Sequence, residues 1–311
     1  MSKHTATAFD FSDLSNKQQE RIGSQVHNAL KTSDILRVGE SRHDDKLLHP
    51  GDSHKMAQGT SIHSWGSYHK LVSQARTFCK YCWSEYGIRN VNQIKPQMVQ
   101  SFIRELGERA YSRNTIDAYA SGVNRFANVL DRAYGGHRTA TWGKAVDNVR
   151  STVLADAPRK DTVTRAYERP DELISSIRGE GYQVAARLQL ECGLRVSDAL
   201  KLRELRETGS ISNSKGGQVI TPHLSDSLKT ALFRLEGSDL NPTRQGYTNA
   251  LKNACLDQNT AYQGTHGLRH NYAQAQYNGY RAMGANKGEA LQMTSEDMGH
   301  HRQDITLTYL R

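Results

Sequence analysis

Apolar residues recur at steps of three and four along residues 61–150, the spacing of one face of an α-helix. The first run extends from Trp65 to Cys82, and a second follows Pro96, a residue that suits the first turn of a helix. Ser112 precedes a third run as a candidate helix cap. The pattern predicts a compact helical domain of about four helices.

The first 58 residues are polar and, apart from one stretch, lack this spacing. A short helix is predicted around Leu14–Leu30, and residues 39–59 have the Gly, Asp, Ser and Pro content of a linker. Its histidines His43, His49 and His54 lack the spacing of metal ligands. We expect a polar arm and linker, which leaves binding of accessory DNA and contact with a neighbouring protomer both open.

A charged segment, Asp156–Glu168, is predicted to join two domains. Beyond Pro170, apolar runs such as Leu228–Leu235 and Tyr247–Leu256 indicate further helices. Residues Ile211–Leu224 place two glycines between short β-compatible pieces, which predicts a small hairpin or edge sheet.

The expected fold class is therefore mainly α with a small β-hairpin or sheet. We expect three parts: a polar N-terminal arm and linker at 1–58, a helical domain at 59–155 and a further domain at 156–311. A chain of 311 residues is long enough for two domains of ordinary size.

The charge balance favours a polyanionic partner. Lys and Arg number 41 against 32 Asp and Glu, which gives a net charge of +9 and a pI near 9.3. Such an excess favours phosphate neutralisation. No apolar run approaches the roughly 20 residues of a membrane span, and the N-terminus lacks the apolar core of a secretory signal. We therefore expect a cytoplasmic protein that has no membrane partner, and the charge is compatible with a nucleic-acid partner without identifying one.

The four cysteines do not indicate a disulfide framework. Cys79 and Cys82 form a C-x-x-C pair inside a helical run, without the second ligand pair that a zinc site needs. We expect both to be buried packing residues, and we expect no metal and no cofactor.

Five residues with the chemistry of phosphodiester cleavage occur in one order in the C-terminal half. Arg195 lies in E-C-G-L-R-V-S-D, and His266 and Arg269 lie in T-H-G-L-R-H. His300 lies in M-G-H-H-R, and Tyr309 follows nine residues later. Arginine matches two phosphate oxygens with a fixed charge, and histidine can transfer protons. A tyrosine becomes a nucleophile when a base or nearby cations help it ionise.

These motifs resemble those of the tyrosine recombinases, the phage-integrase family. The family patterns G-L-R-x-S-E/D, H-x-L-R-H, L-G-H and T-x-x-Y match four segments of this chain, which are 193–198, 266–270, 298–300 and 306–309. Met298 replaces the leucine of the third pattern, a change that conserves volume. The matches cover about residues 161–311, whereas the helical domain agrees with the family in size and order only.

The resemblance implies a role for each matched residue. Arg195 and Arg269 would bind the phosphate, and His266 would assist proton transfer. His300 would bind the phosphate or position the nucleophile, and Tyr309 would attack. The family also has a catalytic lysine in a β-hairpin, where it protonates the leaving oxygen.

Lys215 fits the expected position of that lysine because it directly precedes the two glycines of the predicted hairpin. Lys201 and Lys229 fit less well because both lie in segments that read as helical. In the helical domain, Arg113, Asn114 and Arg125 are candidate contacts to the DNA backbone.

The resemblance further implies a SAM-like core-binding domain at 59–155 and a catalytic domain at 156–311. The implied function is a site-specific DNA recombinase or integrase of a mobile element that works through a 3′-phosphotyrosyl intermediate. The implied partners are duplex DNA with an inverted-repeat core site, a homo-tetramer on two duplexes and an accessory DNA-bending protein.

Three other interpretations remain open at this point. A type IB topoisomerase would relax supercoiled DNA without a site requirement. An inactive or accessory relative would bind DNA without forming a covalent adduct. A helical regulator with chance motif matches would not bind DNA at all.

Overall fold

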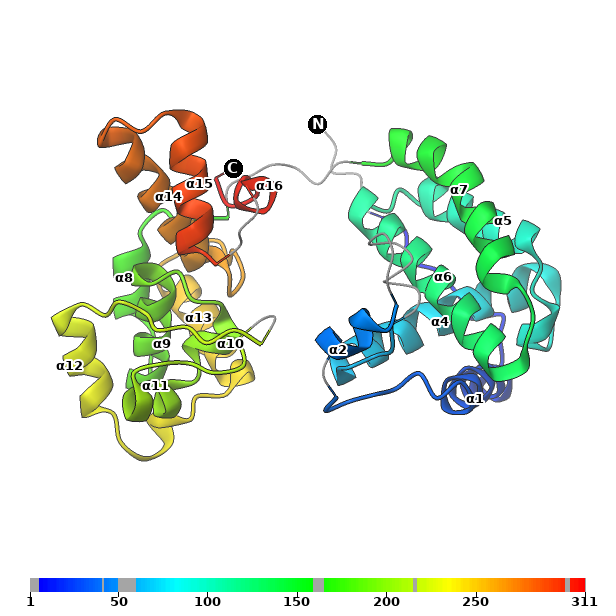
Figure 1. Ribbon diagram of the computed structural model, residues 1–311, viewed down its shortest axis with the longest axis horizontal. Helices are drawn as coiled ribbons and strands as arrows, with labels where there is room; N and C mark the ends of the chain where they lie inside the picture. The colour runs from blue at the N-terminus through cyan, green and yellow to red at the C-terminus, as the bar shows by residue number, and fades with distance from the viewer. Residues whose placement is uncertain are drawn as a thin grey trace. The chain divides into compact units, whose positions relative to one another are not determined.

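The computed structural model describes residues 6–40, 42–49, 60–158, 165–214, 217–299 and 303–310. It divides into two units, Met1–Asp161 and Thr162–Arg311. Both are built mainly from helices (Figure 1), which confirms the mainly α class. The division falls inside the segment 156–168 that the charge pattern marks as a linker. None of the helices in the described ranges is both long and apolar enough to cross a membrane.

Unit 1 contains the helices predicted from the apolar spacing. Its helices are α1 (Asn16–Thr32), α2 (Arg42–Leu47), α4 (Trp65–Tyr86), the 3-10 turn η1 (Val91–Gln93), α5 (Pro96–Glu108), α6 (Arg113–Tyr134) and α7 (Arg138–Asp156). Pro96 is the first residue of α5, and Ser112 caps α6 by accepting the Thr115 N–H. Both start signals are thus confirmed.

The core of unit 1 forms where α5 and α6 pack against α7, and α4 packs against α6. Its largest side chains, Phe78, Phe102, Phe126 and Trp142, are at most 1% exposed. Burying one such side chain contributes about 1.5–3 kcal/mol. Cys79 and Cys82 lie in the same core as free thiols, which confirms their packing role.

Gly107 does not end α5, because the helix continues to Glu108. A Cβ atom at this glycine would approach Cγ1 of Val153 on α7 to 2.7 Å. The missing side chain therefore lets α5 and α7 pack closely.

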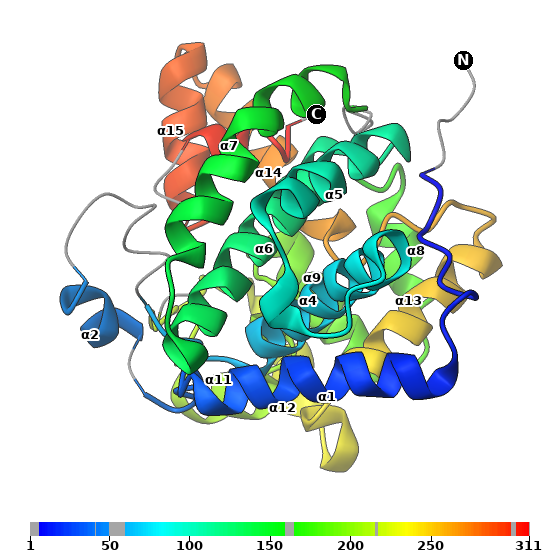
Figure 2. The same cartoon turned by 90° about the vertical axis from the view of Figure 1, so that its right-hand side faces the viewer.

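The N-terminal region is better ordered than its polar composition predicts. A capping box of Ser15 and Gln18 begins α1. The helix buries Ile22, Val26 and Leu30 against α4 and α6. Figure 2 shows α1 running crosswise to α7. The helix predicted around Leu14–Leu30 is therefore present, and it packs on the core of unit 1. The helix α2 lies within residues 39–59, which were predicted to be a linker.

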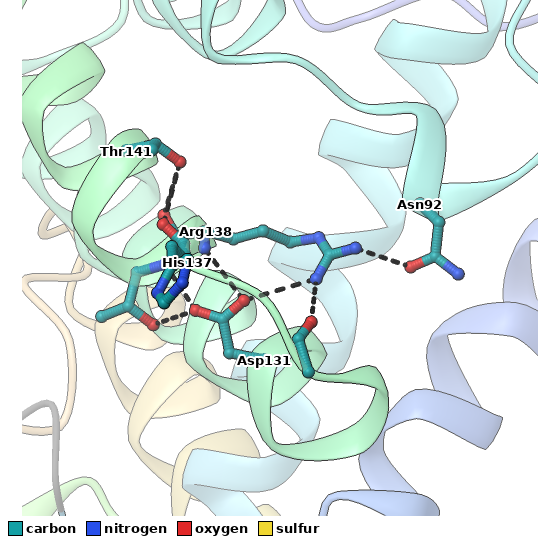
Figure 3. A network of polar contacts seen from close by, with 7 residues as sticks. Asn92, Asp131, His137, Arg138 and Thr141 are labelled. Carbon is teal, nitrogen blue, oxygen red and sulfur yellow. Dashed lines mark hydrogen bonds and ion pairs between the residues drawn. The ribbon is translucent and has the colours of Figure 1, made fainter.

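A polar network fixes the turn between α6 and α7 (Figure 3). Asp131 accepts the backbone N–H groups of Arg138 at 2.9 Å and of Thr139 at 2.7 Å. Arg138 in turn donates to the Gly135 carbonyl at 2.6 Å and to Asn92 Oδ1 at 3.1 Å. Asp131 therefore satisfies the first N–H groups of α7 from outside the helix.

Unit 2 packs around α9. Its helices are α8 (Pro170–Ser175), α9 (Glu180–Glu191), α10 (Val196–Ala199), α11 (Leu202–Thr208), α12 (Asp226–Arg234), the 3-10 turn η2 (Gly237–Leu240), α13 (Arg244–Asp257), α14 (Gly267–Ala282), α15 (Lys287–Asp297) and α16 (Gln303–Thr306). α9 contacts α8, α10, α12 and α14, and its Leu188 is fully buried. α14 also packs along α15, and the two lie side by side in Figure 1.

The predicted hairpin at 211–224 is not present as paired strands in the described residues. Ile211 and Ile220 form an isolated antiparallel bridge, with backbone N–H to O distances of 2.8 and 2.9 Å. Ser214 adds a bond from its N–H to the Gln218 carbonyl at 2.9 Å. The chain therefore reverses direction here, but the pairing is too short to form a ladder.

Candidate active site

The start of α14 presents two of the predicted site residues. His266 is the residue before the helix, and Arg269 lies in its first turn. His266 is half-buried, whereas Arg269 is only 2% exposed. The helix thus carries a buried cation close to an accessible imidazole.

Arg269 connects separate segments of unit 2. Its Nη1 donates to the carbonyl of Gly193, and its Nη2 donates to the carbonyl of Met298 at 2.7 Å. Gly193 lies just before Arg195, and Met298 lies at the end of α15. One guanidinium therefore holds two sequence motifs against a third.

The turn before Arg195 needs a glycine. Gly193 has a φ of 62°, in the left-handed region, and a Cβ there would lie 2.4 Å from Cδ1 of the Tyr272 ring. Arg195 then occupies the position just before α10, makes no capping hydrogen bond with its side chain and is half-buried. Among the described residues, its guanidinium has no hydrogen-bond or ion-pair partner. Its charge is thus available to an incoming anion.

The side chain of Asp198, in the same motif, is buried inside unit 2. It is 2% exposed and accepts a hydrogen bond from Oγ of the buried Ser214 at 2.9 Å. This bond joins α10 to the 211–220 turn. Asp198 therefore braces the segment that carries Arg195.

Tyr309 lies against α14. Its ring centroid is 4.6 Å from that of His270, and the Arg269 Cζ lies 5.7 Å from the Tyr309 ring centroid. Gln274 Nε2 also donates to the Tyr309 carbonyl at 3.3 Å. The structure thus brings Tyr309 and Arg269 together, although 40 residues separate them in the sequence.

The charge around His266 is strongly positive. Burial lowers the pKa of His266, and the charges of four arginines lower it further. In decreasing order of effect, these are Arg269, Arg165, Arg244 and Arg195. We call these four side chains the arginine cluster. A cluster of cations of this kind attracts a phosphate group and favours a neutral imidazole.

The Arg269 guanidinium responds to the same surroundings. Burial lowers its pKa, and the charge of Arg195 acts in the same direction. The Tyr309 side chain, which hydrogen-bonds to Arg269, opposes both effects. Arg269 and the Tyr309 phenol are therefore electrostatically linked.

Arg165 and Arg244 were not among the residues selected from the sequence. Arg165 lies near the end of the charged linker segment 156–168, and Arg244 begins α13 after the capping residue Thr243. Neither belongs to a recognisable motif, and only the folding of unit 2 brings their charges near His266. The basic composition was the one available signal.

His270 provides a test of the burial in this region. Burial lowers the pKa of His270 to about 4 from its ordinary 6.5, Arg165 adds to the shift, and a hydrogen bond to the Tyr309 backbone opposes it. Below pH 6.5 the unfolded chain therefore binds a proton that the folded chain excludes. Stability is fully present above this pH and is lost as the pH falls towards 4, by about 3 kcal/mol.

We expect the free energy of unfolding, measured with urea, to fall more steeply between pH 6.5 and 4.5 for the wild type than for His270→Gln. The glutamine variant cannot take up this proton and serves as the control. Identical slopes for the two proteins would mean that His270 is not a buried neutral imidazole.

Two predicted catalytic residues lie outside the described residues. Lys215 belongs to the gap between Ser214 and Gly217, and His300 belongs to the gap after Gly299. Nearby, Lys201 donates from Nζ to the Ser212 carbonyl, and its Nζ lies 3.9 Å from the Glu204 carboxylate. The Lys201 ammonium group is thus bound by neighbouring groups of its own segment of unit 2. The assignments of Lys215 and His300 remain predictions.

Two of the three candidate DNA-contacting residues of unit 1 make hydrogen bonds inside this unit. Arg113 donates from Nε to the Leu154 carbonyl at 2.6 Å. Arg125 donates from Nη2 to the carbonyls of Thr60 and Ser61, the latter at 3.0 Å. Asn114 is exposed in the first turn of α6. The two arginines therefore stabilise unit 1 internally, and a role in DNA contact stays a prediction for all three.

Within the described ranges, His, Cys, Asp and Glu side chains do not gather into a group that could hold a metal ion. The residues that converge in unit 2 are instead cations and a phenol. Such groups bind and polarise an anion directly.

The fold has a counterpart among solved structures. The chain matches a tyrosine-to-phenylalanine variant of the Tn1549 transposon integrase in complex with transposon right end DNA. The TM-score is 0.51 at 13% sequence identity, and the match covers 91% of this chain and 94% of that one. No protein-family model matches the chain, nor does any curated protein. The chain thus has an integrase-like fold.

Proposed function

We propose that this protein is a tyrosine-type site-specific DNA recombinase, an integrase of a mobile element. The observation that carries the proposal is the contact of Tyr309 with Arg269 and His270 beside the arginine cluster. The integrase-like fold and the excess of basic residues support it. A phenol beside converging guanidinium groups has the parts needed to attack a phosphodiester.

In the proposed reaction, the phenol oxygen of Tyr309 attacks the scissile phosphorus. A bond forms between phosphorus and this oxygen, and the bond to the 5′ oxygen breaks. The phenol loses its proton, and the leaving 5′ oxygen gains one. Attack by the 5′-hydroxyl of a second duplex reverses these steps and exchanges strands without an external energy source.

The arginines stabilise the negative charge that develops on the phosphate oxygens. Arg195 acts through its available guanidinium, and Arg269 acts from the buried side next to Tyr309. His266 is held neutral by burial and by the arginine cluster, so it is suited to accept the phenol proton. Lys215 is the proposed donor to the 5′ oxygen, and His300 is proposed to bind the phosphate.

The nucleophile is proposed to act in cis. Tyr309 and Arg269 belong to one unit and touch within it. A protomer would therefore cleave with its own tyrosine. Four protomers on two duplexes, with inverted half-sites, form the proposed assembly.

The first test is the detection of the covalent intermediate with wild-type protein. Nicked duplexes covering the DNA beside its gene would be incubated with the protein and resolved on a denaturing gel. We expect a slower band for the duplex that holds the core site, because the nick lets the cleaved strand escape and traps the adduct. Trypsin should leave the DNA attached to the peptide that begins at Gln303.

Two outcomes would contradict the proposal. Tight binding without an adduct on any duplex would identify an inactive or accessory DNA-binding protein. Relaxation of supercoiled plasmid without any site requirement would instead identify a topoisomerase.

A further inference from the structure

We infer that Arg165 and Tyr167 are positioning residues that hold the loop in front of His266 in its working conformation. The inference rests on the proposed function, because it concerns a residue of the proposed site. Residues 165–167 belong to none of the sequence motifs, and the inference gives them a part in placing His266.

Tyr167 contacts this loop through its side chain. The residue is 3% exposed, and its phenol oxygen accepts the N–H of Gln263 at 3.2 Å. The same hydroxyl donates to the carbonyl of Gly264 at 3.2 Å. One buried hydroxyl thus satisfies both a donor and an acceptor of the loop, at positions three and two residues before His266.

The backbone of Tyr167 makes a second connection. Its N–H donates to Oδ1 of Asn271 at 2.9 Å, and its carbonyl accepts from Nδ2 of Asn271 at 2.7 Å. Asn271 belongs to α14, the helix that begins after His266. Tyr167 therefore hydrogen-bonds to the chain both before His266, at residues 263 and 264, and after it, at Asn271.

Arg165 binds the same loop, and we call Arg165 and Tyr167 together the clamp. Its Nε and Nη2 both donate to the Gln263 carbonyl, at 3.3 and 3.0 Å. Its charge also lowers the pKa of His266 and of His270. The side chain thus fixes the loop and contributes to the positive field at the site.

The loop is shaped to fit this clamp. A Cβ atom at Gly267 would lie 2.3 Å from Cε2 of the Tyr167 ring and 2.9 Å from the Arg165 carbonyl. Gly264 has a φ of 84°, in the left-handed region. Glycines at these two positions let the loop pass over Tyr167, which explains the glycine after His266 by packing.

Precise placement matters for proton transfer. An error of about 1 Å at a reacting group can lower a rate by roughly 10²-fold. His266 precedes α14, so its position depends on the backbone of residues 263–267. Hydrogen bonds from a buried tyrosine and an arginine restrict that backbone.

The test compares Tyr167→Phe with Tyr247→Phe. The first removes only the hydroxyl that holds residues 263 and 264 and that also hydrogen-bonds to the Cys255 thiol. The second removes an equally buried hydroxyl of unit 2, which donates to Oε1 of Gln189 at 2.7 Å and, among the described residues, makes no hydrogen bond to residues 263–267. Both variants keep the aromatic packing, so a difference between them reports on the loop.

We expect Tyr167→Phe to speed hydrogen exchange of the Gln263 amide and to slow single-turnover cleavage of the nicked duplex by about 10-fold at saturating DNA. Noncovalent DNA affinity should stay unchanged. Tyr247→Phe should change neither the loop exchange nor the cleavage rate. Arg165→Gln, on the surface side of the clamp, should also speed exchange at residue 263.

Faster exchange with an unchanged cleavage rate would overturn the positioning role, and so would unchanged exchange in both clamp variants. An absence of adduct with the wild type and with Tyr247→Phe would instead count against the proposed function. Hydrogen exchange still reports on the clamp in that case, so the two failures are distinguishable.

Discussion

Replacing Tyr309 by phenylalanine is expected to abolish the covalent DNA adduct and to leave noncovalent DNA binding intact. The variant keeps the ring that packs 4.6 Å from His270 but lacks the attacking oxygen. Loss of a nucleophile lowers the rate of such enzymes by at least about 10⁴-fold. The measurement is the adduct band on a denaturing gel, together with a filter-binding titration of the same duplex.

Tyr277→Phe is the matched control for this experiment. Tyr277 lies half-buried on α14, and its hydroxyl has no hydrogen-bond partner among the described residues. This variant should form the adduct at the wild-type rate. A band that persists in Tyr309→Phe would show that another residue attacks the DNA.

Replacing Arg269 by lysine should weaken both the reaction and the fold. An ammonium group cannot reproduce the planar fork that reaches the Gly193 and Met298 carbonyls at once. A buried carbonyl without its donor costs about 1–3 kcal/mol in the free energy of unfolding. We also expect the cleavage rate to fall by roughly 10²–10³-fold, the usual effect of removing one cation from a developing anionic centre.

The control for this variant is Arg281→Lys on the same helix. Arg281 also donates to a carbonyl, that of Ala285 at 2.6 Å, but it is exposed. Urea unfolding separates the loss of stability from the loss of rate. An unchanged cleavage rate in a folded Arg269→Lys protein would remove Arg269 from the proposed chemistry.

A mixture of Arg269→Lys and Tyr309→Phe protomers tests the cis arrangement. Because both residues act within one unit, neither protomer can complete the other's site, and the mixture should be no more active than Arg269→Lys alone. Recovery of cleavage would mean that the tyrosine acts in a neighbouring protomer.

Apolar spacing and start signals were sufficient to predict the helices α4, α5 and α6 of unit 1. Pro96 and Ser112 act locally, so their effect can be read without the rest of the fold. The packing of α1 could not be predicted in this way, because its few apolar positions lie among polar residues. Ile22 and Val26 became core residues only through the surfaces that α4 and α6 provide.

The motifs of the site were recognisable because each is short and contiguous. In the structure Arg269 lies beside the Tyr309 ring, although 40 residues separate the two in the sequence. Arg165, Tyr167 and Arg244 stand alone in the sequence, and their contribution depends on long-range contacts. The paired strands predicted at 211–224 are not present for a related reason. Two glycines predict a reversal of the chain, but a ladder also needs partner segments long enough to pair.

The arginine cluster has a consequence for the DNA-free protein. Four like charges act on His266, and no carboxylate is among the groups that shift its pKa. Asp198 opposes part of this positive charge at Arg269. An anion that binds among these arginines only in the folded form raises the melting temperature by mass action. Inorganic sulfate should therefore protect unit 2 from unfolding. Under the proposed function, DNA would serve as the counter-ion of the fold as well as the substrate.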